Sequence, residues 1–142
     1  MKIHEATLTY REVRDGPTES LDEPEKVVRY MEGAFAPDPT VEWFQVILLN
    51  RKNIPLGRTV VTKGTASSSL VHSREVFKPA ILAGASAVIV VHNHPSGDPA
   101  PSQADIQVTR MLREAAKVLS IDLLDHVIIG DDYYSFNEAG LL

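Results

Sequence analysis

The chain of 142 residues is 44% hydrophobic and 23% charged, a composition typical of one soluble globular domain. Its formal net charge of -5 argues against generic electrostatic binding to nucleic acid, which needs an excess of Lys and Arg, although a local basic patch stays compatible with it. Without cysteine the chain forms neither disulfides nor thiolate zinc sites, and it has no apolar run typical of a signal core or a membrane span. We therefore expect a cytoplasmic protein that does not bind membranes, and the oligomeric state stays open.

Residues 1–20 predict an N-terminal strand and loop ahead of the main domain, residues 21–142. Ala6, Leu8 and Tyr10 alternate with threonines, a pattern typical of a strand that buries one face at the edge of a sheet. The segment after Tyr10 is rich in polar and turn-forming residues, so we expect a loop there.

The main domain should begin with a helix and a β-hairpin. Asp22 as N-cap and Pro24 in the first turn predict a helix whose apolar face extends to Phe35. An apolar run from Glu42, a polar turn and a second run predict the hairpin. The remaining expected ranges are 42–49 and 56–62 for the hairpin strands, 64–69 for a connecting loop, 73–82 for a helix ended by Gly84, and 123–129 and 133–136 for two late strands.

The most informative stretch runs from His92 to Asp105. Residues 87–91 are apolar and mostly β-branched, which predicts a buried strand with His92 at its end. Because residues two apart on an extended chain point the same way, His92 and His94 can offer both imidazoles to one metal ion. A turn then reverses the chain, and Ser102 opens an amphipathic helix with Asp105 in its first turn. The carboxylate can then reach back to the histidines.

Two histidines and one aspartate are three protein ligands, the number found where zinc keeps a fourth position open for water. An isolated HxH is more often a pair of ordinary polar residues, and SxxD is commonly only a capping box. The spacing of these residues after a buried strand is what favours a catalytic zinc site. The letters His-Asn-His also occur in HNH nucleases, but that family spreads them over a longer ββα unit. Zinc is the expected ion, although such ligands accept other divalent metals.

The pattern HxHP, six residues and then SxxD resembles the signature of the JAMM metalloproteases, also called the JAB or MPN domain. Four short segments around this pattern are similar to the bacterial RadC branch: Ser96-Gly97, Leu124-Asp125-His126, Ile128-Ile129-Gly130 and Ser135-Phe136. The resemblance implies an α/β (α+β) fold in which helices sandwich a curved, mixed, largely antiparallel sheet. Residues 1–20 do not resemble the helix-hairpin-helix region of longer RadC proteins, so the DNA role of that region is not transferred.

The resemblance also implies a zinc-dependent hydrolase that cuts a peptide or isopeptide bond in a peptide or protein substrate. Zn2+ would be held by His92, His94 and Asp105. Ser102 would donate a hydrogen bond to the developing oxyanion.

In the family the acid-base group is a glutamate at the start of the strand after the first helix, and Glu42 matches that position within Glu-Trp-Phe. Glu75 and Asp98 are the alternatives to Glu42. Asp125 and His126 are expected to be strand residues with ordinary partners, with orientation of a metal ligand as the alternative role.

Two other functions remain open. The first is a protein that binds or processes nucleic acid, consistent with the DNA-repair label of RadC, and the acidic net charge weighs against it. The second is a non-catalytic MPN scaffold. Such scaffolds typically lack the ligand set, whereas this chain retains it, so the enzyme is favoured.

Overall fold

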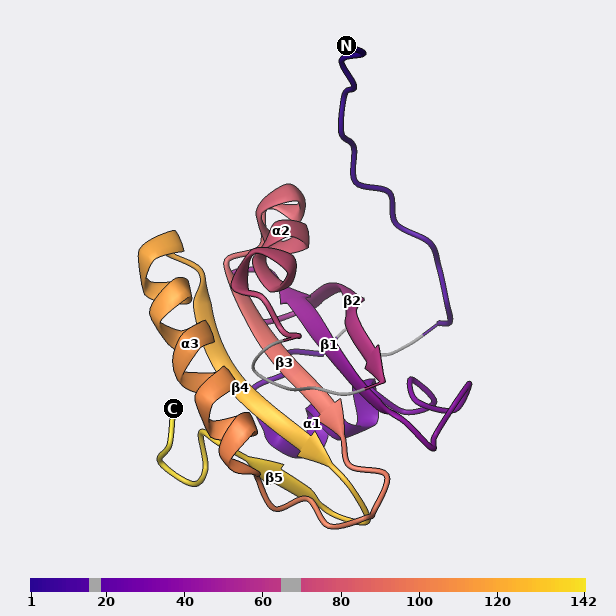
Figure 1. Cartoon of the computed structure of the whole chain (residues 1–142), viewed down its shortest axis with the longest axis vertical. Coiled ribbons are helices and arrows are strands. Elements are labelled where there is room, and N and C mark those ends of the chain that lie inside the picture. Colours follow the sequence, from indigo (N-terminus) through magenta and orange to yellow (C-terminus); the bar gives the residue numbers. More distant parts are fainter. Residues whose placement is uncertain (16–18, 65–69) are drawn as a thin grey trace.

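The computed structural model describes residues 1–15, 19–64 and 70–142. Within these ranges three helices cover a five-stranded mixed sheet with the strand order β2-β1-β3-β4-β5 (Figure 1). The elements are α1 (Pro24–Tyr30), β1 (Glu42–Leu49), β2 (Pro55–Gly64), α2 (Ser73–Ala83), β3 (Ala87–Asn93), α3 (Gln103–Leu119), β4 (Asp122–Ile129) and β5 (Tyr133–Ser135). The predicted α/β sandwich with a largely antiparallel sheet is confirmed. Of the predicted loop at 64–69, all but Gly64 lies outside the described residues.

The sheet is antiparallel except at the pair β3 and β4. β1 pairs antiparallel with both β2 and β3, and in the second pair Phe44 lies opposite His92. Because α3 carries the chain back across the sheet, β4 runs parallel to β3, and β5 returns antiparallel to β4. The carboxyl ends of β3 and β4 therefore lie at the same end of the sheet as the start of α3 (Figure 1).

Alternating side chains of the central strands divide the interior into two cores. One core lies between the sheet and the helices α2 and α3, and the other lies between the sheet and α1. The first core contains Val46, Leu48, Val88, Val90 and Leu112, and the second contains Val27, Ile47, Leu49, Ile89 and Val91. Every residue of β3 is buried, as predicted for a strand covered on both faces. The strand that carries His92 is therefore held from both sides.

The helix boundaries agree with the sequence for α2 and α3 but not for α1. α2 ends at Gly84 in the left-handed conformation, as predicted. The N-cap of α1 is Glu23 rather than Asp22, whose carboxylate instead contacts the Lys26 ammonium. The helix stops at Tyr30, well before Phe35, and residues 31–37 continue as hydrogen-bonded turns. These turns still bring apolar side chains into the second core, so burial did not require a longer helix.

The predicted N-terminal strand is wrong. Residues 1–15 contain no strand, and Tyr10 is 60% exposed. The Tyr10 ring lies near β2, and a Cβ added to Gly57 would be 3.5 Å from it. A short alternation without a tight turn to set the register does not specify pairing, which explains the difference. The division between residues 1–20 and 21–142 stays a prediction.

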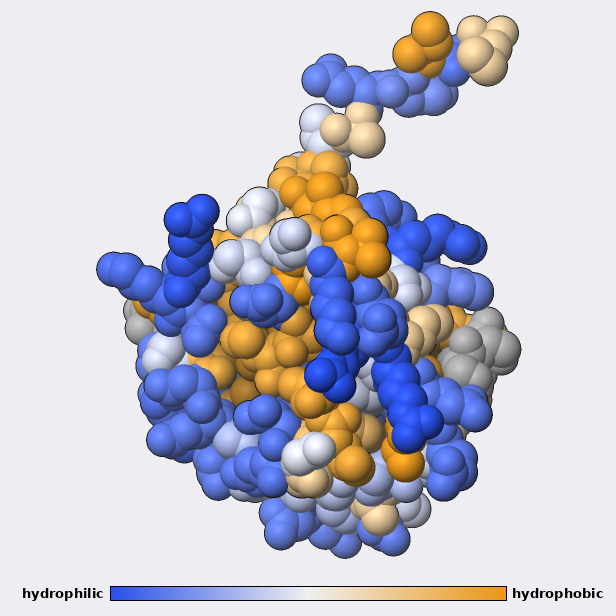
Figure 2. Space-filling view, turned by 90° about the vertical axis from the view of Figure 1, so that its left-hand side faces the viewer, coloured by the Kyte–Doolittle hydropathy of each residue, from blue (hydrophilic) through white to orange (hydrophobic). Residues whose placement is uncertain are grey.

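Apolar side chains also cover part of the outer surface of α2 and α3 (Figure 2). This surface includes Ile81 and Leu82 of α2 and Val118 and Leu119 of α3, all of them exposed. Because a helix rises 1.5 Å per residue, Val118 lies roughly 20 Å along α3 from Asp105. This surface is thus well separated from the start of the helix. None of the helices in the described ranges is long and apolar enough to cross a membrane.

Candidate metal centre

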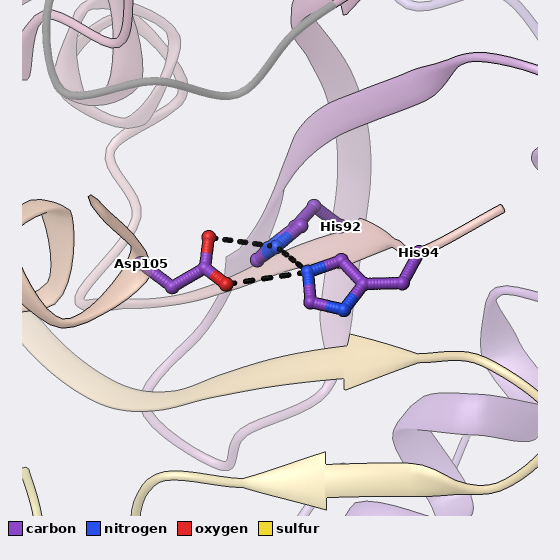
Figure 3. A group of neighbouring side chains, drawn as sticks. All are labelled: His92, His94 and Asp105. Atoms are coloured by element: carbon purple, nitrogen blue, oxygen red, sulfur yellow. Dashed lines mark hydrogen bonds and ion pairs between the residues drawn. The ribbon is translucent and has the colours of Figure 1, made fainter. Parts of the chain in front are cut away.

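His92, His94 and Asp105 meet where β3 ends and α3 begins (Figure 3). His92 is the penultimate residue of β3, His94 is the first residue after it, and Asp105 lies in the first turn of α3. The Nε2 atoms of the two histidines are 3.1 Å apart, and Asp105 places Oδ1 3.1 Å from His92 Nε2 and Oδ2 3.2 Å from His94 Nε2. The three residues expected from the sequence are therefore brought together.

These separations fit one small divalent cation. Nitrogen and oxygen ligands about 2.0–2.1 Å from a tetrahedral zinc ion lie about 3.3 Å from one another. The three observed separations are 3.1, 3.1 and 3.2 Å. His92 is fully buried and Asp105 nearly so, whereas the His94 side chain is 12% exposed. The residues present thus suit a metal ion that can be approached from the His94 side.

A backbone carbonyl orients the His94 ring. The Nδ1 atom of His94 is 2.8 Å from the carbonyl oxygen of Asp98. Since a carbonyl only accepts hydrogen bonds, the ring hydrogen is on Nδ1, and Nε2 presents its lone pair to the cluster. The His94 backbone is held as well, because its amide donates to the carbonyl of Ile129 at 2.9 Å. His94 is therefore fixed at both its backbone and its ring.

Two glycines allow the loop that carries His94 to lie against the turn between β4 and β5. Gly97 has a φ of 91°, which favours glycine, and its carbonyl accepts from the Asp131 amide at 2.7 Å. A Cβ on Gly130 would lie only 2.2 Å from the Gly97 carbonyl oxygen. The close approach of these two backbones therefore requires glycine at position 130.

Asp105 is held as a carboxylate by its position at the start of α3. Its Oδ2 accepts from the Ser102 amide at 2.8 Å, while Ser102 Oγ accepts from the Asp105 amide at 3.1 Å, forming a capping box. Burial raises the pKa of Asp105, but hydrogen bonding that includes the Ser102 amide outweighs burial and leaves its pKa below the ordinary value. The bond to Ser102 Oγ uses a lone pair, so the hydroxyl hydrogen can still be donated elsewhere.

Glu42 is the first residue of β1, the strand that pairs with β3. The β1–β3 ladder ends with Phe44 opposite His92, and Glu42 lies two residues before Phe44 on β1. Residues two apart on a strand share a face, which puts Glu42 on the sheet face that carries His92. The side chain of Asn93 accepts from the Trp43 amide at 2.7 Å and donates to the Val41 carbonyl at 3.0 Å. Asn93 thus anchors the backbone on both sides of Glu42.

The two alternatives to Glu42 are engaged elsewhere. Glu75 lies in the first turn of α2 and pairs with Lys78 at 3.1 Å. The Asp98 carboxylate accepts from the Ala100 amide at 3.0 Å, although the Asp98 carbonyl does orient His94. Neither carboxylate belongs to the His92, His94 and Asp105 group.

His126 lies in β4, as expected, but its partners are His92 and Thr109, so the contacts favour the alternative role over ordinary strand partners. Its Nε2 lies 2.8 Å from His92 Nδ1, and burial, together with His92, lowers the pKa of His126 well below its ordinary value. Asp125 does have ordinary partners, because it accepts from the Ser135 hydroxyl and from the amides of His126 and Asn137. The parallel pairing of β3 with β4 brings His126 to His92, and the local sequence around either histidine carries no signal of that pairing.

Comparison with known proteins identifies the family of this chain. The RadC-like JAB domain family matches residues 21–141. The chain is 48% identical over 126 residues to a UPF0758 protein of Geobacter sulfurreducens, covering 88% of this chain and 55% of the relative. It is 54% identical over 117 residues to one of Chlorobium luteolum, covering 82% and 52%, and 50% identical over 121 residues to one of Staphylococcus aureus, covering 84% and 55%. The chain thus spans about half the length of these relatives. By these matches the chain belongs to the RadC-like JAB domain family.

Proposed function

We propose that this chain is a zinc-dependent hydrolase of JAMM type that cleaves a peptide or isopeptide bond. The observation that carries the proposal is the convergence of two imidazole nitrogens and one carboxylate within 3.1–3.2 Å of one another. Three protein ligands, with a partly exposed His94, leave room for water and substrate. A purely structural zinc site would instead be closed by a fourth protein ligand.

A zinc ion held there would polarise a substrate carbonyl and let a water molecule lose its proton near neutral pH. Glu42, on the same face of the sheet, would accept that proton and deliver it to the leaving nitrogen. The amide bond then breaks into a carboxylate and an amine, with the water's oxygen on the new carboxylate. Ser102 would donate its hydroxyl hydrogen to the oxyanion that develops on the carbonyl oxygen.

Replacement of Glu42 by Gln tests the proposal, with Glu75→Gln as the matched control. Gln keeps the size of the side chain but cannot take up the proton, so turnover should fall by roughly 100-fold or more while zinc stays bound. Glu75→Gln should keep both turnover and zinc, because Glu75 lies on α2 and pairs with Lys78. Activity is measured on a library of labelled peptides and isopeptides, and zinc by elemental analysis. Full turnover in Glu42→Gln, or loss of its zinc, would count against the role of Glu42.

A further inference from the structure

A chain of buried polar groups leads away from the metal ligand His92. His92 Nδ1 lies 2.8 Å from His126 Nε2, and His126 Nδ1 lies 2.6 Å from Thr109 Oγ1. The Thr109 hydroxyl lies 2.8 Å from the backbone carbonyl oxygen of Asp105. The side chains of His92 and His126 are completely buried, and Thr109 is 1% exposed. Every polar atom along this path therefore has to find its partner within the protein.

The hydrogens along this path can be assigned from its far end. The Asp105 carbonyl can only accept, so the single hydroxyl hydrogen of Thr109 is donated to it. Thr109 Oγ1 must then accept from His126, which places the His126 ring hydrogen on Nδ1. A neutral His126 has no hydrogen left for Nε2, so that atom accepts from His92 Nδ1. His92 therefore carries its hydrogen on Nδ1 and presents the Nε2 lone pair to the cluster.

The surroundings of His126 hold it neutral and in place. Its ring stacks on Phe136 with centroids 4.7 Å apart and 7° between the planes, and the Phe44 ring packs at 68° to it with centroids 5.6 Å apart. A second proton on this ring would create a fully buried cation between two aromatic side chains, which is costly. The aromatic rings also fix the ring plane, so His126 cannot rotate to exchange its two nitrogens without repacking the core.

We propose that Thr109 and His126 are positioning residues that select the metal-binding tautomer of His92. Thr109 lies one helical turn after Asp105, and its hydroxyl bonds to the Asp105 backbone. The first turns of α3 thus supply both a ligand and the far end of the path that orients a second ligand. The inference rests on the proposed metal site, but the tautomers it assigns can be measured without any metal.

Thr109→Val and Thr109→Ser form a matched pair that tests the inference. Val has nearly the same shape as Thr but lacks the hydroxyl, whereas Ser keeps it. Removing the hydroxyl leaves His126 Nδ1–H without an acceptor, so the His126 hydrogen should move to Nε2. That atom faces His92 Nδ1, so two N–H groups would then point at each other unless His92 gave up its Nδ1 hydrogen. Zinc affinity of Thr109→Val, measured by competition with a chromophoric chelator, should fall by roughly 10–100-fold, and that of Thr109→Ser should stay close to wild type.

Nitrogen NMR of isotope-labelled histidines in the metal-free protein gives an independent readout. The inference predicts that His126 in the wild type and in Thr109→Ser carries its hydrogen on Nδ1, the less common tautomer of a histidine side chain in water, and that Thr109→Val moves it to Nε2. A merely structural role for Thr109 would not move this hydrogen. His126 carrying its hydrogen on Nε2 in the wild type, or equal zinc affinity in all three proteins, would overturn the inference. If the wild type binds no zinc, the proposed function fails, and the NMR result alone still decides the assignment of the tautomers.

Discussion

Gly130 lies under the loop that carries His94, so Gly130→Ala should disturb the metal centre from outside it. The added Cβ would lie 2.2 Å from the Gly97 carbonyl oxygen and 2.7 Å from its carbonyl carbon. Because such contacts are hardly ever shorter than 3.0 Å, the loop has to retreat by roughly 1 Å. Over-packing of this kind costs about 1–3 kcal/mol in the free energy of unfolding. The retreat also draws the Asp98 carbonyl away from His94 Nδ1, so zinc affinity should fall by roughly 10–100-fold.

Chemical denaturation and chelator competition separate these two effects, and Gly57→Ala is the control. Gly57 lies in β2, where a Cβ would meet the Tyr10 ring at an ordinary 3.5 Å, so the same substitution should change stability by less than about 1 kcal/mol and leave zinc affinity unchanged. Gly130→Ala that is destabilised but binds zinc as tightly as wild type would refute the reasoning, because the loop would then not orient His94.

Two further predictions concern Asn93 and the buried Asp125. Asn93→Ala should lower turnover more than zinc affinity, because it releases the backbone on both sides of Glu42. Kinetics and chelator competition measure the two quantities, and an equal loss of both would contradict the prediction. Burial raises the pKa of Asp125, so the folded protein binds a proton at Asp125 more tightly than the unfolded protein does. Protonation of Asp125 therefore stabilises the fold at low pH, and this stabilisation is lost as the pH rises through the raised pKa. The free energy of unfolding of the wild type and of Asp125→Asn is measured by denaturation from acidic to neutral pH. The wild type should lose stability relative to the variant as the pH rises, and an equal pH dependence of the two proteins would contradict the raised pKa.

The three candidate ligands were predictable because their geometry is local. His92 and His94 share a face by the period of an extended chain, and Asp105 follows from a turn and a helix start within the same stretch. Glu42 was predictable only through the resemblance, because it comes from a different strand. Its place on the His92 face depends on the register of β1 with β3, which the residues around Glu42 do not encode.

The contact of His126 with His92 could not be predicted from the sequence, for the same physical reason. His126 is 34 residues from His92 in sequence, and its contact with His92 depends on the parallel pairing of β3 with β4 across α3. The N-terminal strand was predicted but does not form, because the alternation of Ala6, Leu8 and Tyr10 has no strand with which to pair. Local periodicity therefore predicted which faces are apolar, and long-range pairing decided which polar groups meet.

The metal content of protein purified without added metal tests the central claim most directly. Elemental analysis should find about one zinc ion per chain in the wild type, because three protein ligands converge on one position. His94→Ala removes one of those ligands and should lose the metal, while the buried β3 keeps the fold intact. The absence of metal from both proteins, even after zinc is supplied, would contradict the account and leave a RadC-like JAB domain without the chemistry proposed for it.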